Sequence, residues 1–144
     1  MTAPLTALPP RAGLSRRFSA MVYDGFLLTA LLFVGSWLFL KLFGDATQGP
    51  LRYVYQLFLL GLCACYLVYC WSHDGQTLAM KTWGLRVVRD DSSPLTLGNA
   101  LLRFVLALGS LALAGCGFLW ALVDSDRQFL HDRLGGTRIV RAPI

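Results

Sequence analysis

The chain has 144 residues, of which 56% are hydrophobic and only 15% are charged, and its mean hydropathy is +0.56. A soluble domain of this size leaves much of its chain exposed and needs more polar surface, so the composition excludes an ordinary soluble protein and predicts a single membrane domain. The net charge of +5 comes from Lys and Arg residues that flank apolar segments, a pattern that follows the positive-inside rule rather than nucleic-acid binding. We therefore expect the lipid bilayer as the partner and no nucleic acid.

A short basic arm, residues 1–11, precedes the first apolar segment, which runs from Phe18 to Leu40. This run is longer than the roughly 7–15 apolar residues of a signal peptide, and no small-residue cleavage site follows it. We predict a first membrane helix that is retained, with the N-terminus on the cytoplasmic side.

Two charged residues lie at the beginning of this segment, Arg17 and Asp24. They are seven residues apart, which is two helical turns, so they share one helix face at an axial offset of about 10.5 Å. That offset is too large for a direct ion pair. Because a lone carboxylate at bilayer depth is costly, we expect Asp24 to have another partner: Arg103, Arg133 or a cation.

Two further apolar segments follow at residues 53–72 and 104–123, each without a charge and long enough to span a bilayer. The aromatic residues near segment ends are expected to be interfacial, Trp71 among them. The four cysteines are all within apolar segments and are predicted to be packing residues. The third segment leaves two alternatives open: it either crosses the bilayer or enters it and returns on the same side.

Two observations favour the same-side alternative. If the third segment returns, every Lys and Arg except Lys41 and Arg52 is cytoplasmic, whereas a full crossing leaves almost no charge bias. In addition, the β-branched runs at 84–89 and 137–141 are predicted to be strands, and they can pair only if they lie on one side.

The polar cluster at residues 125–136 ends at a glycine pair and is predicted to form a short interfacial helix. His73-Asp74 and His131-Asp132 are two similar pairs, but their spacing is a weak signal for a metal, so we expect a solvated face and no metal site. No phosphate loop, nucleophile elbow or zinc-protease motif occurs in the sequence. We expect neither a cofactor nor an enzymatic activity.

These pieces, in this order, resemble the RDD family of small membrane proteins, which is named for one arginine and two aspartates. The stretch "RFSAMVYD" supplies Arg17 and Asp24, and "LHDRLGGTRIV" supplies Asp132 and Thr137. An arginine early in the third segment matches Arg103. The resemblance covers residues 12–141, so only the arm and residues 142–144 lie outside it.

The middle signature of the family is matched by "TLAMKTWGLRVV". The matching residues are Thr77, Lys81, Gly84, Arg86 and Val87. Ala79 stands where the family has glycine, and the lysine falls one place later than in the family pattern. The sequence thus predicts an all-α membrane protein with three apolar segments, a short interfacial helix and a small two-stranded ribbon.

The resemblance implies a multi-pass protein of the bacterial inner membrane, with transport of ions or a small ligand suggested for the family. Our own hypothesis is that Asp24 is the responsive group in such transport. A homo-oligomer or a membrane partner would then be needed, because three segments are too few to enclose a path. The alternative is an accessory or assembly protein whose charged signature is structural and whose basic cytoplasmic face binds lipid or a partner protein.

One spatial prediction follows from the cost of buried charge. Arg17, Asp24 and the region of Asp132 are expected to converge near the cytoplasmic boundary, with Arg103 or Arg133 beside one of the aspartates. Thr96, Asn99 and Arg103 would form the polar stripe that turns inward, and His131 and Arg133 would lie close to it.

Overall fold

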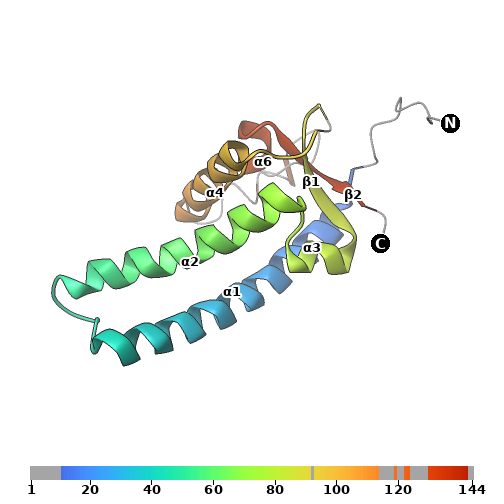
Figure 1. Ribbon diagram of the computed structural model, residues 1–144. Helices are drawn as coiled ribbons and strands as arrows, with labels where there is room; N and C mark the ends of the chain where they lie inside the picture. Colours follow the sequence, from blue (N-terminus) through green and yellow to red (C-terminus); the bar gives the residue numbers. More distant parts are fainter. Residues whose placement is uncertain (1–10, 92, 114–118, 120–121, 124–129, 143–144) are drawn as a thin grey trace.

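The computed structural model describes residues 11–91, 93–113, 119, 122–123 and 130–142. Two long helices, α1 (Leu14–Phe43) and α2 (Leu51–His73), form an antiparallel hairpin (Figure 1). The remaining elements are α3 (Leu78–Trp83), β1 (Leu85–Arg89), α4 (Leu97–Ala112), α6 (Leu130–Leu134) and β2 (Thr137–Arg141). The expected fold class is confirmed: the protein is mostly helical, with two long apolar helices, a shorter third one and a small antiparallel sheet.

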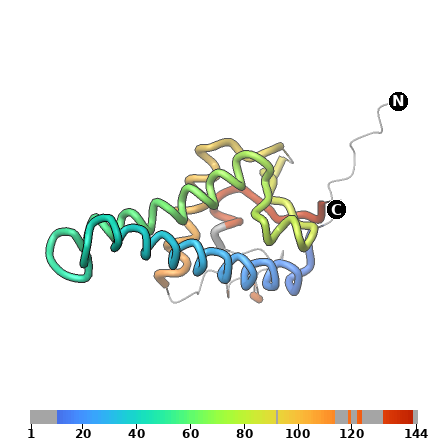
Figure 2. The backbone as a smooth tube through the Cα atoms, turned by 60° about the horizontal axis from the view of Figure 1, so that its bottom comes forward, coloured from blue at the N-terminus to red at the C-terminus, as the bar shows by residue number. Residues whose placement is uncertain are grey.

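The hairpin forms because the two apolar runs are unbroken and pack closely near its loop. Phe39 of α1 contacts the rings of Tyr55 and Phe58 of α2, and the hydroxyl of Tyr55 donates a hydrogen bond to Ser36 at 2.7 Å. Gly35 allows the close approach, since an added Cβ would lie 2.4 Å from Leu62 Cδ1. Beyond these contacts the hairpin exposes large apolar side chains, and its loop end projects away from the other described elements (Figure 2).

The sheet lies at the opposite end of the hairpin. β1 and β2 are antiparallel, with Val87 opposite Ile139, and Arg11 extends the sheet through a bridge to Val140. The pairing of the two predicted strands is therefore confirmed, and it places them at one end of the hairpin, as the same-side alternative requires.

The third apolar segment, which was predicted either to cross the bilayer or to return, forms a shorter helix. Helix α4 begins at Leu97, where the side chain of Thr96 accepts a hydrogen bond from the backbone of Asn99, and it ends at Ala112. Leu113 is in a turn, so a continuous helix over residues 104–123 is not formed. Most of the second half of that segment, and the first part of the predicted interfacial helix, lie outside the described residues.

Helix α3 was not anticipated from the sequence. It is too short to show a hydrophobic period, and its ends are set by local contacts. The hydroxyl of Thr77 accepts a hydrogen bond from Met80 N at 3.2 Å, and Gly84 ends the helix in the left-handed conformation with φ 63°. The cap residues Thr77 and Gly84 are the sequence signal that could have revealed it.

The core gathers where the sheet, α3 and α4 meet the polar end of the hairpin. The buried side chains come from all of these elements. They include Ala20, Trp71, Met80, Leu85, Val87, Ala100, Phe104 and Ile139. This core fixes the elements around a cavity that contains the charged residues of α1.

Candidate functional site: a charged cavity at the polar end of the hairpin

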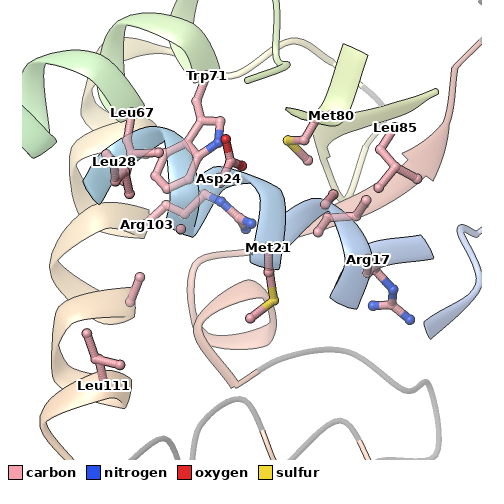
Figure 3. A pocket seen from close by; sticks show the side chains of 14 residues that line it. Arg17, Met21, Asp24, Leu28, Leu67, Trp71, Met80, Leu85, Arg103 and Leu111 are labelled. Carbon is pink, nitrogen blue, oxygen red and sulfur yellow. The ribbon is translucent and has the colours of Figure 1, made fainter. Parts of the chain in front are cut away.

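A cavity of about 310 Å³ lies between the polar end of the hairpin, α3, α4 and the sheet (Figure 3). Most of its lining is apolar, with Met21, Leu28 and Leu67 among the contributing residues. Its charged side chains are Arg17 and Asp24 of α1 and Arg103 of α4. Three residues that are far apart in the sequence thus line one space among apolar helices.

The carboxylate of Asp24 is held on one side only. Its Oδ2 accepts a hydrogen bond of 2.7 Å from the hydroxyl of Thr77, which is 1% exposed. The same hydroxyl caps α3, so the orientation of Thr77 is fixed by its own helix. Among the described residues, Oδ1 of Asp24 has no hydrogen-bond partner, although it is buried. Asp24 therefore has one oxygen available to a bound species.

Arg17 is 4% exposed and lines the same cavity from the first turn of α1. It lies two turns before Asp24 on the same face of the helix. A guanidinium remains charged at any physiological pH, so Arg17 contributes a fixed positive charge to the cavity lining.

Arg103 belongs to a buried polar network. It forms an ion pair with Asp132 of α6 and donates a hydrogen bond of 3.0 Å to the hydroxyl of Thr137 in β2. Its guanidinium also lies over the ring of Trp71, with 4.8 Å between Cζ and the ring centroid. Asp132 is fully buried, and this network joins α4, α6, β2 and the end of α2.

The predicted convergence is therefore present in a modified form. Arg17, Asp24 and Arg103 share the cavity, and Asp132 is reached through Arg103 rather than lying in the lining. The expected arginine partner of Asp24 is wrong: within the described part of the chain Asp24 forms no ion pair, and its partner is Thr77. Arg103 is instead engaged by Asp132 and by the hydroxyl of Thr137.

The supporting residues are divided between the core and the surface. Thr77 and Thr137 are each 1% exposed and take part in the contacts above. Arg86 and Arg133 are exposed, and the side chain of His131 lies outside the described part. The prediction that Arg103 or Arg133 lies near one of the aspartates is met by the pair of Arg103 and Asp132.

Trp71 is a cavity residue that the sequence analysis did not anticipate. It was expected to be interfacial, and the structure shows that it is 7% exposed and lines the cavity beside Asp24. Its position near the end of an apolar run is equally typical of an interfacial and of a buried ring. Met80 also lines the cavity and had no signal of its own, since the helix that contains it was missed.

Lys81 lies outside this network and pairs with Asp74 at the surface, with 2.6 Å between Nζ and Oδ2. The hydrogen bond and the charge of Lys81 hold the pKa of Asp74 below its ordinary value, and the same two effects of Asp74 raise the pKa of Lys81. Because the pKa of Asp74 is lowered in the folded protein, its contribution to stability is present at pH values above the ordinary carboxyl pKa, and it is lost as the pH falls through the folded-state pKa. Because the pKa of Lys81 is raised, its contribution is present at pH values below the ordinary amine pKa, and it is lost as the pH rises through the folded-state pKa.

We therefore expect the contribution of this pair to stay constant between roughly pH 5 and pH 9. Both side chains are about half exposed, so solvent screens the pair. Lys81→Met should leave the thermal unfolding midpoint in detergent unchanged within error across this range, as should the control Arg86→Met. A large decrease in the unfolding midpoint for Lys81→Met alone would show that the pair contributes substantially to stability.

Comparison with known proteins agrees with these features. The sequence model of the RDD family matches residues 11–136, which is most of the chain and includes Arg17, Asp24, Arg103 and Asp132. The match ends one residue before Thr137, the first residue of β2. No curated protein and no solved structure is significantly similar to the chain. The order of the apolar helices, the position of the charged residues and the extent of this match together show that the chain belongs to the RDD family.

Proposed function

We propose that this chain is a multi-pass protein of a bacterial inner membrane, with α1 and α2 crossing the bilayer and the sheet on the cytoplasmic side. Both helices are long and apolar enough to cross, and only 11% of the residues in the most apolar stretch of each are buried within the protein. A helix in the core of a soluble protein would bury far more of its surface, whereas lipid covers an exposed apolar helix. The sheet end contains Arg11, Arg86 and Arg141, which the positive-inside rule assigns to the cytoplasm.

This placement gives Asp24 a defined depth. The part of α1 from Asp24 to Phe43 is about 30 Å long at 1.5 Å per residue, which matches the hydrocarbon core. Asp24 then lies at the cytoplasmic edge of that core, level with the end of α2. The cost of its charge is reduced there, and the cavity remains open to exchange with the cytoplasm.

The function that this geometry supports best is transport of an ion or a small ligand, with Asp24 as the responsive group. The observation that carries the proposal is the combination of an apolar cavity with a carboxylate oxygen that has no partner among the described residues. Intramembrane acids in such cavities are typical of ion and proton pathways. Two long helices cannot enclose a path alone, so we propose a homo-oligomer or a complex with another membrane protein as the transporting unit.

We expect reconstituted protein to mediate an ion or proton flux into liposomes, measured with a pH-sensitive dye and with ion-selective dyes, and we expect Asp24→Asn to abolish it. The matched control is Asp45→Asn, which changes an exposed aspartate of the loop between α1 and α2. Both variants should purify as folded protein. Equal flux for the parent protein and Asp24→Asn would refute the assignment of Asp24.

The second candidate is an accessory or assembly protein, and one observation favours it. Arg103, Asp132 and Thr137 are buried together and join three elements, which is the arrangement of a structural network. If Arg17 and Asp24 also served only to fix packing, Arg17→Ala and Asp24→Asn would both lower the unfolding midpoint in detergent. Preserved stability with lost flux would favour transport instead.

A further inference from the structure

We propose that the species bound at Asp24 is a proton and not a metal cation. The inference rests on the proposed function of the cavity and deepens it by naming what the site takes. The donors and acceptors that line the cavity support it, and a binding measurement that needs no flux tests it.

The first argument is the number of oxygen ligands. Of the described residues that line the cavity, Asp24 is the only one whose side chain contains oxygen. The hydroxyl of Thr77 already donates to Asp24 Oδ2 and accepts from Met80 N. The neighbouring carbonyl of Gly25 accepts a hydrogen bond of 2.7 Å from Thr29. Hard cations require about six or more oxygen ligands, whereas a proton requires one lone pair.

The second argument is that the other polar groups in the lining are hydrogen-bond donors. Trp71 Nε1 is buried and has no hydrogen-bond partner among the described residues, and an indole N–H can only donate. The guanidinium groups of Arg17 and Arg103 also present donors and positive charge. Figure 3 shows Trp71, Asp24 and Arg103 directed into the same space. These donors offer a metal cation no lone pair, and the charge of Arg103 is already paired with Asp132, but they accommodate a carboxyl group that gains and loses a proton.

The titratable neighbours leave Asp24 as the responsive group. Arg17 lies on its own helix, Arg103 faces it from α4, and Tyr66 and Cys70 on α2 interact with its charge. Thr77 on α3 does not titrate. Arginine, tyrosine and cysteine side chains ordinarily change charge above about pH 8. A second carboxylate near Trp71, that of Asp132, is paired with Arg103, so a transition between about pH 4 and pH 7.5 is assigned to Asp24 by its loss in Asp24→Asn.

Trp71 provides the reporter because it lines the same cavity. The experiment uses full-length protein in detergent with Trp37→Phe, Trp83→Phe and Trp120→Phe, so that Trp71 is the only tryptophan. His73→Gln is added, so that no imidazole lies within two residues of the reporter Trp71. Fluorescence is followed as a function of pH at low NaCl and at about a hundredfold higher NaCl, with ionic strength held constant by N-methylglucamine chloride.

We expect one transition whose midpoint does not depend on Na⁺ and that disappears in Asp24→Asn. If Asp24→Asn does not purify as folded protein, Asp24→Glu replaces it and should shift the midpoint without removing the transition. Asp45→Asn is the control and should leave the transition unchanged.

The opposite outcomes are equally specific. A cation that competes with the proton would lower the midpoint by about one pH unit for each tenfold increase in its concentration once it is saturating. Such a shift with Na⁺ or K⁺, the absence of any transition, or a transition that survives in Asp24→Asn would each overturn the inference. Because the measurement is made without a membrane gradient, a protein that binds the proton but shows no flux would contradict the transport function and not the proton site.

Discussion

Arg103→Met is expected to destabilise the protein by about 3–5 kcal/mol, because breaking a buried ion pair on one side leaves an uncompensated charge. The variant removes the cation that faces Asp132, which is 0% exposed, and leaves a buried carboxylate without its arginine. It also removes the hydrogen bond to Thr137 and the cation–π contact with Trp71. The loss should be measured as the change in free energy of unfolding in a mild detergent.

A double substitution separates the ion pair from simple packing. Arg103→Met combined with Asp132→Leu removes both charges and places apolar groups of similar length in the same space. We expect the double variant to recover most of the stability that the single variant loses, because apolar pairs often replace buried ion pairs at little cost. Arg86→Met, which removes an exposed arginine on β1, is the control and should have little effect. An Arg103→Met protein as stable as the parent would contradict the structural role of the network.

The second large effect is expected for Gly75→Ala, between α2 and α3. Gly75 has φ 68°, a left-handed conformation that costs other residues about 1–2 kcal/mol. A Cβ at this position would also lie 2.8 Å from the carbonyl oxygen of Val87, which is backbone and cannot move aside. The carbonyl of Gly75 accepts a hydrogen bond of 2.7 Å from Val87 N, so the clash would separate β1 from the end of α2. We expect a loss of at least about 2 kcal/mol in unfolding free energy.

Gly61→Ala is the matched control for this substitution. Gly61 lies in α2, and an added Cβ would meet no atom within 4 Å. Alanine is the better helix former, so this variant should be as stable as the parent or slightly more stable. Equal stability of Gly75→Ala and Gly61→Ala would mean that the turn after α2 can relax.

The sequence predicted the elements that depend on long, uninterrupted patterns. Helices α1 and α2 extend the predicted apolar segments by only a few residues at each end, because a run of apolar residues without charges has few alternatives to a helix in lipid. The pairing of β1 with β2 was also predicted, since both are β-branched runs bounded by turn residues.

The site was predicted less completely, and the physical reason differs for each residue. The cost of buried charge predicts that Arg103 has an acidic neighbour. Whether that neighbour is Asp132 or Asp24 depends on how the helices pack in three dimensions, which the spacing of residues in the sequence does not determine. The contact of Asp24 with Thr77 joins residues 53 positions apart through a helix that the sequence did not reveal. Thr77 was named from the family signature, but its contact with Asp24 was not predicted because that contact depends on α3.

The closing of the sheet by its last strand has a consequence for how the protein is made. β1 is synthesised well before β2, and the bridge of Arg11 to Val140 joins the start of the described chain to its end. In the membrane arrangement proposed above, the α1–α2 hairpin would enter the bilayer during translation before Asp132 is available to Arg103 and before β1 has its partner strand. The fold cannot be completed until residue 141 has been synthesised. Before then, the unpaired edge of β1 and the unpaired Arg103 are exposed to chaperones and proteases.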